Sequence, residues 1–321
     1  MKLRKTVPHS FRIGIDLMGC DSAPEDLYRV ILQLVQDDFP AELVFFASYE
    51  VGGELDSSLN IVKCSQVIQM DDDPLLAVRR KKDSTLCQGL QYLKEKKIDA
   101  FVSAGNTGAL LFAAKTTLKT LKGIDRPALL ALLPTKKKEV AVLDVGANLH
   151  LKAEHIVQFA AMGIAYQKSR GIANPTVGLL NIGTEAKKGT PQLQEAYLKL
   201  DAMNRDQPFF AGNIEGKDVF HGNIDVLVTD GFTGNVFLKT AEGIAAFILE
   251  ELSREGFKHE LSSLRSRMHY AEYPGAILCG VNGAVVKCHG DSSPETFIHG
   301  IKGALRLVEH GFLEKIKSQL S

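Results

Sequence analysis

Short apolar runs typical of buried β-strands alternate along the chain with amphipathic patterns of helical period. A strand, a helix and another strand in succession imply a right-handed crossover between parallel strands, with helices on both faces of the sheet. The sequence therefore predicts an α/β fold, a three-layer α/β/α sandwich with a mostly parallel sheet. The predicted strands are residues 11–17, 98–103, 140–145, 176–182 and 224–229, and the predicted helices are 24–36, 107–119, 154–167 and a helix after Thr233.

One segment departs from this alternation. Between residues 244 and 268, apolar residues recur at helical spacing on both sides of Gly256, which predicts two consecutive amphipathic helices that form a helical arm. No linker rich in proline, glycine or serine divides the chain, so we expect a single α/β/α domain over residues 1–321. The polar face of the arm could contact an acidic protein, a membrane surface or a second subunit.

Composition narrows the classes of partner. The 38 Lys and Arg residues balance 38 Asp and Glu residues, so the net charge is 38 − 38 = 0, and binding to nucleic acid, which requires a strongly basic face, is not expected. No apolar run approaches the roughly 18–20 residues that span a bilayer, and no secretory signal is expected at the start of the chain. Five cysteines without a C-x-x-C pair are typical of reduced thiols in the cytosol.

Candidate chemistry lies in the loops that follow the predicted strands. Parallel strands end at one edge of a sheet, so these loops are expected to line a single crevice. Their glycines allow close backbone approach, and the free N–H groups that open each following helix favour an anion. Turn formation and helix capping remain the alternative for any one of them. The five loops are residues 103–108, 144–148, 181–189, 230–235 and 287–293.

Several familiar chemistries are not indicated. The chain has no G-x-G-x-x-G or P-loop fingerprint and no G-x-S-x-G elbow. Asp71, Asp72 and Asp73 are expected to form a solvated turn, and neither a metal nor a cofactor is expected. Cys288 and His289 are adjacent on a predicted strand and would point to opposite faces, which disfavours a cysteine nucleophile. The bound anion could itself be the nucleophile.

Ordered blocks over nearly the whole chain resemble the PlsX-type phosphate acyltransferases of bacterial phospholipid synthesis. The main blocks are 15–19 (IDLMG), 101–110 (FVSAGNTGAL), 144–148 (DVGAN), 177–185 (VGLLNIGTE), 230–236 (DGFTGNV) and 280–283 (GVNG), with further blocks at 79–84, 126–128 and 287–290.

The resemblance implies an activity. A fatty acyl group would move from acyl carrier protein (ACP) to inorganic phosphate by direct attack on the thioester, giving an acyl phosphate for a downstream membrane glycerol-phosphate acyltransferase. It also implies a cytoplasmic homodimer with peripheral membrane contact, and a fold similar to phosphate acetyltransferases and isocitrate/isopropylmalate dehydrogenases.

The resemblance also assigns candidate site residues. Lys188 would neutralise phosphate or the developing oxyanion, and Asn235 would donate a hydrogen bond to it. A solvent-facing lysine and a helix-capping asparagine are the alternatives. His289 is a candidate proton donor to the leaving thiolate, or else a core histidine bonded to backbone. The phosphate- or substrate-binding candidates are Gly105, Asn106, Thr107, Gly146, Asn148, Thr184, Asp230, Thr233 and His289.

The sequence departs from the family pattern in two loops. Cys20 stands where the family usually has glycine and Ser22 where it often has histidine, which puts phosphate contacts by that loop in doubt. His150 replaces a common acidic residue and Ala153 a usual proline.

Acidic ACP requires a basic docking surface. Three basic patches are candidates for ACP docking, and the third could instead rest on lipid: Arg79, Arg80, Lys81 and Lys82; Lys136, Lys137 and Lys138; and, on the arm, Arg254, Lys258, Arg265 and Arg267.

Two other functions stay open at this point. One is a short-chain acyl-CoA phosphate transferase, that is, a phosphate acetyl- or butyryltransferase on a related sandwich. The other is a non-catalytic, lipid-responsive scaffold at the membrane surface, suggested by the amphipathic arm.

Overall fold

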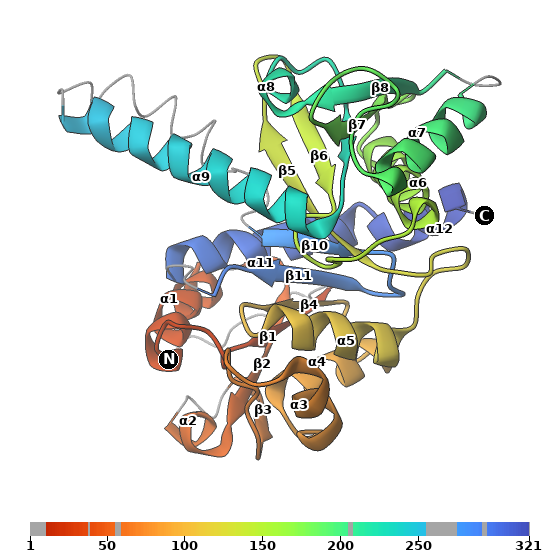
Figure 1. Ribbon diagram of the computed structural model, residues 1–321. Helices are drawn as coiled ribbons and strands as arrows, with labels where there is room; N and C mark the ends of the chain where they lie inside the picture. Colours follow the sequence, from red (N-terminus) through yellow and green to blue (C-terminus); the bar gives the residue numbers. More distant parts are fainter. Residues whose placement is uncertain are drawn as a thin grey trace. The chain divides into compact units, whose positions relative to one another are not determined.

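The computed structural model describes residues 11–37, 39–54, 59–204, 208–254, 275–290 and 294–320. The chain divides into two compact units, shown in Figure 1. The first unit comprises Met1–Lys119 and Val281–Leu313, and the second comprises Thr120–Gly280 and Glu314–Ser321. The expectation of a single domain over residues 1–321 stays a prediction.

The first unit has a parallel sheet with the strand order β3-β2-β1-β4-β11. Its central strands β1 and β4 are almost entirely buried, as expected of parallel strands covered on both faces. The strands are β1 (Arg12–Asp16), β2 (Glu42–Ser48), β3 (Asn60–Cys64), β4 (Ala100–Ser103) and β11 (Ala284–Cys288).

Helices cover both faces of this sheet. Phe101 and Val102 are consecutive on β4, so their side chains point to opposite faces. A Cβ atom added at Gly89 of α4 would lie 2.0 Å from the Phe101 ring, and one at Gly300 of α11 would lie 3.7 Å from Val102 Cγ1. The predicted three layers are therefore present in this unit. Its helices are α1 (Pro24–Gln36), α2 (Tyr49–Glu54), α3 (Pro74–Arg80), α4 (Thr85–Lys94), α5 (Thr107–Leu118) and α11 (Pro294–Glu309).

The second unit has a mixed sheet with the strand order β10-β5-β6-β9-β7-β8. Four strands, β6, β9, β7 and β8, are parallel, whereas β5 is antiparallel to both β6 and β10. Together with the first unit, this confirms a mostly parallel α/β fold. The strands are β5 (Ala128–Pro134), β6 (Glu139–Leu143), β7 (Val177–Asn181), β8 (Phe210–Glu215), β9 (Val226–Val228) and β10 (Gly275–Cys279).

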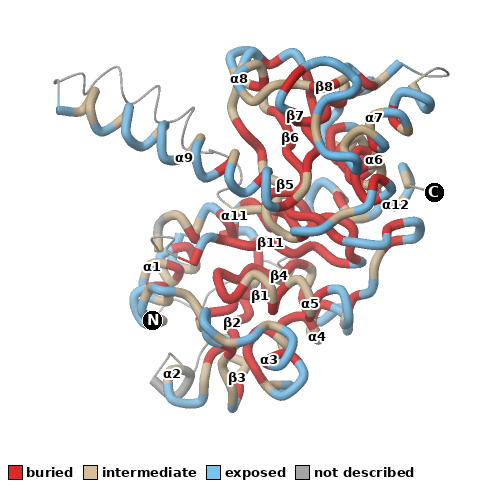
Figure 2. Tube along the Cα trace, in the orientation of Figure 1, coloured by how far each residue is buried: buried red, intermediate tan, exposed pale blue. Residues whose placement is uncertain are grey.

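Helix α9 is the longest helix of the second unit in the described ranges, with 24 residues. It contains residues 244–254 of the predicted arm without a break, and the remainder of the arm, 255–268, lies outside the described residues. Most of α9 is exposed or intermediate, whereas strands β5, β6, β7 and β9 are mostly buried (Figure 2). The other helices are α6 (Ala153–Ser169), α7 (Pro191–Met203), α8 (Gly216–Val219) and, at the carboxyl end of the chain, α12 (Phe312–Leu320), while α9 spans Gly231–Arg254.

None of the helices in the described ranges is long and apolar enough to cross a membrane.

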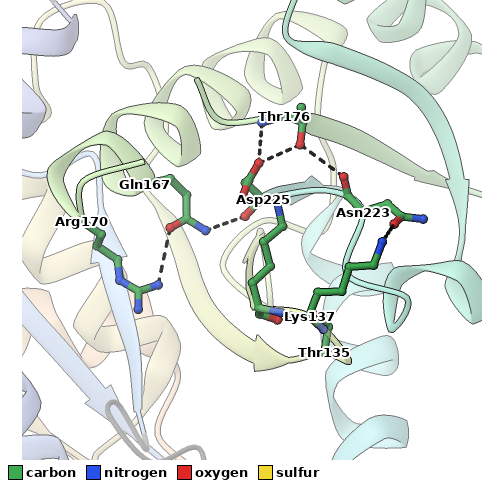
Figure 3. A network of polar contacts seen from close by, with 8 residues as sticks. Thr135, Lys137, Gln167, Arg170, Thr176, Asn223 and Asp225 are labelled. Carbon is green, nitrogen blue, oxygen red and sulfur yellow. Dashed lines mark hydrogen bonds and ion pairs between the residues drawn. The ribbon is translucent and has the colours of Figure 1, made fainter. Parts of the chain in front are cut away.

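A network of hydrogen bonds and ion pairs connects the segments that precede β7 and β9 in the second unit (Figure 3). Asp225, just before β9, accepts hydrogen bonds of 2.8 Å from the backbone N–H and the hydroxyl of Thr176, which precedes β7. Lys138 pairs with the same carboxylate. Burial opposes ionisation of Asp225, but the hydrogen bonds from Lys138 and Thr176 outweigh it and lower the pKa of Asp225 below its usual value.

Candidate active site

Three of the five predicted loops begin where parallel strands of the second unit end, at the carboxyl edge of its sheet. Strand β9 lies between β6 and β7, and Leu143 and Leu179 both pair with Val228. Because these three strands are parallel, the loops 144–148, 181–189 and 230–235 begin at the same edge. The prediction that these loops share one edge is therefore confirmed within this unit.

The 144–148 loop folds around the buried carboxylate of Asp144. That carboxylate accepts backbone N–H groups of Leu129, Gly146, Ala147 and Asn148 at 2.7–3.2 Å. It also accepts the Asn148 side-chain amide at 2.8 Å. Burial raises the pKa of Asp144, and these hydrogen bonds partly offset it. Asp144 is therefore a structural centre for the loop.

The start of α9 packs directly on this loop. Gly231 N–H donates to the carbonyl oxygen of Asn148 at 2.8 Å. A Cβ atom at Gly231 would lie 2.7 Å from backbone atoms of Asn148, and one at Gly234 would lie 1.9 Å from the carbonyl oxygen of Asp144. Glycine at both positions thus allows the two loops to touch, and it fixes where α9 begins.

Two candidates in the 230–235 loop bind each other. Asp230 accepts the backbone N–H of Thr233 at 2.9 Å and its hydroxyl at 2.7 Å. This is the arrangement of a helix cap, in which a carboxylate satisfies free N–H groups of the first turn. Asp230 therefore caps the start of α9 with both carboxylate oxygens, and its role in binding phosphate or substrate stays a prediction.

Asn235 differs from the other candidate asparagines because its side chain makes no hydrogen bond to the part of the chain that the structure describes. It is exposed, and a Cβ atom at Gly146 would lie 3.5 Å from Asn235 Oδ1, so its amide sits against the 144–148 loop. By contrast, the Asn148 amide donates to the carbonyl of Pro127 at 2.8 Å as well as to Asp144. Within the described ranges, the Asn235 amide makes no hydrogen bond and can bind a ligand.

Lys188 lies on the exposed 181–189 loop. Its ammonium is 4.0 Å from Glu185 Oε1, and both side chains are about half exposed or more. Such a pair contributes little stability, so the ammonium can exchange its partner for an anion. Thr184, on the same loop, is also exposed. The second unit therefore presents an ammonium, a free amide and a hydroxyl at one edge of its sheet.

The other two predicted loops belong to the first unit, and residues 291–293 of the 287–293 loop lie outside the described residues. They follow the parallel strands β4 and β11, in which Lys287 pairs with Ser103. Ser103 donates its hydroxyl to the buried Asp16 at 2.8 Å and accepts the Gly105 N–H at 3.1 Å. Burial raises the pKa of Asp16 to about 6, although hydrogen bonds from Thr85, Ser103 and Met18 oppose it.

Lys287 is a buried residue that sequence reasoning did not assign. Its ammonium donates to the carbonyl oxygens of Ala104, at 3.2 Å, and Cys288. It therefore links the ends of β4 and β11, and its charge favours the ionised form of Asp16. The available signal was a charged residue inside the apolar run 284–288, together with an aspartate at the end of the first predicted strand.

The remaining first-unit candidates have different surroundings. Asn106 caps α5 by accepting the Ala109 N–H at 3.0 Å, and its amide donates to the carbonyls of Gln69, Met70 and Asp72. These contacts assign Asn106 to holding the loop. His289 is exposed and so is not a core histidine, Thr107 is half-buried and Gly105 is buried.

Comparisons with known proteins identify the family. The family described as "Fatty acid synthesis protein" matches residues 11–315. The phosphate acyltransferase of Chlamydia pneumoniae is 40% identical over 325 residues, covering 96% of this chain and 99% of that protein. The phosphate acyltransferase of Thermoanaerobacter pseudethanolicus is also 40% identical, covering 96% and 97%. The chain belongs to the PlsX-type phosphate acyltransferase family. It is an acyltransferase of lipid biosynthesis, and the resemblance found in the sequence is confirmed.

A solved structure supports the fold. A phosphotransacetylase from Streptococcus pyogenes superimposes with a TM-score of 0.60 at 17% identity, covering 93% of this chain and 94% of that one. At this identity the likeness shows the fold alone. The expected similarity to the phosphate acetyltransferase fold is confirmed.

The loop after β1 carries the thiol of Cys20. Cys20 is half-buried, and its sulfur donates to the carbonyl oxygen of Ser22 at 3.4 Å. Burial raises the pKa of Cys20, and it raises that of Cys288 to about 12. Neither thiol forms a thiolate readily, which disfavours a cysteine nucleophile.

The basic patches of this acyltransferase are only partly available for docking. In the first patch Lys81 pairs with Asp72 at 2.5 Å, whereas Arg79, Arg80 and Lys82 are exposed. In the second patch two lysines are engaged: Lys137 with Asn223 at 2.6 Å and Lys138 with Asp225. In the third patch Arg254 pairs with Glu250 and Glu251, and Lys258, Arg265 and Arg267 lie outside the described residues.

Proposed function

We propose that this acyltransferase transfers a long-chain fatty acyl group from acyl-ACP to inorganic phosphate, giving acyl phosphate and free ACP for phospholipid synthesis. The observation that carries the proposal is the free amide of Asn235 and the exchangeable ammonium of Lys188, which leave the same sheet edge on adjoining parallel strands. No covalent acyl-enzyme is needed, because phosphate is the nucleophile.

Phosphate requires positioning more than activation, since it is already anionic at neutral pH. Lys188 neutralises part of its charge by leaving Glu185, from which it is separated by 4.0 Å. The exposed Thr184 hydroxyl provides a further polar contact. Because α9 begins beside the 144–148 loop, the positive end of its dipole also faces this region.

The chemical step is an acyl transfer in which a phosphate oxygen attacks the thioester carbonyl carbon. Negative charge builds on the carbonyl oxygen, where the Asn235 amide donates a hydrogen bond. Collapse of the tetrahedral intermediate breaks the carbon–sulfur bond, and the electron pair leaves on sulfur. The thiolate then takes a proton from water or from the newly formed acyl phosphate, which still carries the proton of the attacking hydrogen phosphate. His289 stays a predicted proton donor for this step.

The partners and location are proposed on the same basis. Acidic ACP would dock on exposed basic residues, of which Arg79, Arg80 and Lys82 are not paired with a carboxylate in the described residues. The acyl phosphate would pass to a membrane glycerol-phosphate acyltransferase. We propose that the enzyme works as a cytoplasmic homodimer with peripheral membrane contact.

A direct assay tests the donor and the acceptor together. Long-chain acyl-ACP and short-chain acyl-CoA are supplied separately, and thiol release is followed with and without phosphate. We expect phosphate-dependent release from acyl-ACP, with acyl phosphate as the second product. Preference for short acyl-CoA would contradict the proposal and support the phosphate acetyl- or butyryltransferase alternative. Vesicle binding without turnover would support the scaffold alternative.

A further inference from the structure

The backbone of the loop that carries Lys188 is held by three amide side chains. Asn181 Nδ2 donates to the carbonyl oxygen of Lys188 at 3.0 Å. Asn213 Nδ2 donates to that of Glu185 at 2.8 Å. Gln194, on α7, donates to the carbonyls of Lys187 and Gly189 at 2.9 and 3.1 Å. Side-chain amides thus hold four carbonyls of this exposed loop, those of residues 185, 187, 188 and 189.

Two of these amides form a buried pair. Asn181 ends β7 and Asn213 lies on the neighbouring strand β8, and only 8% and 4% of their surfaces are exposed. Asn181 Nδ2 donates to Asn213 Oδ1 at 3.1 Å, and Asn181 Oδ1 accepts the Ile182 N–H at 2.9 Å. A buried amide without a hydrogen-bond partner destabilises the folded protein by about 1–3 kcal/mol. These contacts therefore hold the two side chains in one orientation.

The same contacts fix the path of the Lys188 side chain. Gly189 has φ +85, and a Cβ atom there would lie 2.6 Å from Asn181 Oδ1. A Cβ atom at Gly183 would lie 3.1 Å from Lys188 Cγ, so the aliphatic part of Lys188 packs over that glycine. The ammonium is therefore placed by a loop whose shape depends on the buried amides.

We propose that Asn213, acting with Asn181, is a positioning residue that holds Lys188 in place for phosphate. It acts through the Glu185 carbonyl and the loop backbone, without contact with substrate. This inference rests on the proposed role of Lys188. A displacement of about 1 Å in a group that orients a reactant can cost roughly 10²-fold in rate. Asn213 lies outside every sequence block that resembled the family, so the sequence alone did not indicate it.

Asn213→Ala and its matched control separate positioning from stability. We expect Asn213→Ala to lower kcat/KM for phosphate by about 10- to 100-fold. The control is Asn204→Ala: this asparagine accepts the N–H groups of Phe209 and Phe210 at 2.6 and 2.7 Å where β8 begins, away from the Lys188 loop. It should lower thermal stability yet keep kcat/KM within about twofold. Asn213→Ser, which keeps a polar atom but shortens the side chain, replaces the alanine variant if that variant does not fold.

A double-mutant cycle measures the coupling between Asn213 and Lys188, which a general loss of stability would not produce. Asn213→Ala combined with Lys188→Ala should be no slower than Lys188→Ala alone, because both changes remove the same function. The inference would be overturned if the double variant were slower than Lys188→Ala by the full factor that Asn213→Ala causes alone. It would also be overturned if Asn213→Ala and Asn204→Ala had the same rate. If Lys188→Ala itself keeps normal phosphate dependence, the proposed function of Lys188 fails and this inference fails with it. If Lys188→Ala is impaired and Asn213→Ala is not, only the inference fails.

Discussion

Replacing Lys188 or Asn235 with alanine is expected to lower kcat by about 10²- to 10³-fold while the protein stays folded, since removal of one donor to a developing oxyanion commonly costs that much. Both side chains are largely exposed, and neither has a strong hydrogen bond within the described residues that its loss would leave broken. Steady-state kinetics with acyl-ACP and varied phosphate, together with circular dichroism, measure the two parts of this expectation.

Lys187→Ala is the control for charge. Lys187 is the exposed neighbour of Lys188, and its backbone carbonyl accepts a hydrogen bond from the Gln194 side chain. We expect its rate to remain near that of the wild type. Near wild-type rates in both Lys188→Ala and Asn235→Ala would show that the catalytic centre is elsewhere, even though the family assignment would stand.

Gly234→Ala is expected to destabilise the protein by about 3 kcal/mol or more and to abolish most activity. Its Cβ atom would lie 1.9 Å from the carbonyl oxygen of Asp144 and 2.8 Å from Thr229 Cγ2. Overpacking of a closely packed site typically costs about 1–3 kcal/mol, and a backbone atom yields less readily than a side chain. Relief of this clash would also move the start of α9, where Asn235 directly follows Gly234.

Gly243→Ala provides the contrast on the same helix. A Cβ atom there meets nothing within 4 Å, so only helix propensity changes, and we expect a gain of about 0.5–1 kcal/mol. Urea unfolding followed by circular dichroism compares the two variants. Equal stability of Gly234→Ala and the wild type would mean that the two loops do not touch as described.

Local patterns predicted much of the fold. The predicted helix 24–36 has the bounds of α1, and the predicted strand 176–182 contains β7 with one extra residue at each end. Strands β2, β3, β5, β8 and β10 were not among the predicted strands. The 128–133 run is uniformly apolar and carries no period that distinguishes a strand from a helix.

The candidate site was predictable in location but not in the use of each side chain. Asn106, Asn148 and Asn235 have the same chemistry and all follow strands, so the sequence could not separate them. Only the fold shows that the first two amides are bonded to carbonyls of distant segments. Asn213 was not found because its partners come from another strand and another loop. Which side-chain amides stay available for a ligand depends on such distant contacts, so it could not be predicted from the sequence.

The central claim is that the loops at the carboxyl edge of the second unit hold phosphate for attack on a thioester. A crystal structure of the full chain with inorganic phosphate bound tests it most directly. The account predicts phosphate oxygens within hydrogen-bond distance of Lys188 Nζ and Asn235 Nδ2. Phosphate bound at another site, with both side chains turned away from it, would contradict the account.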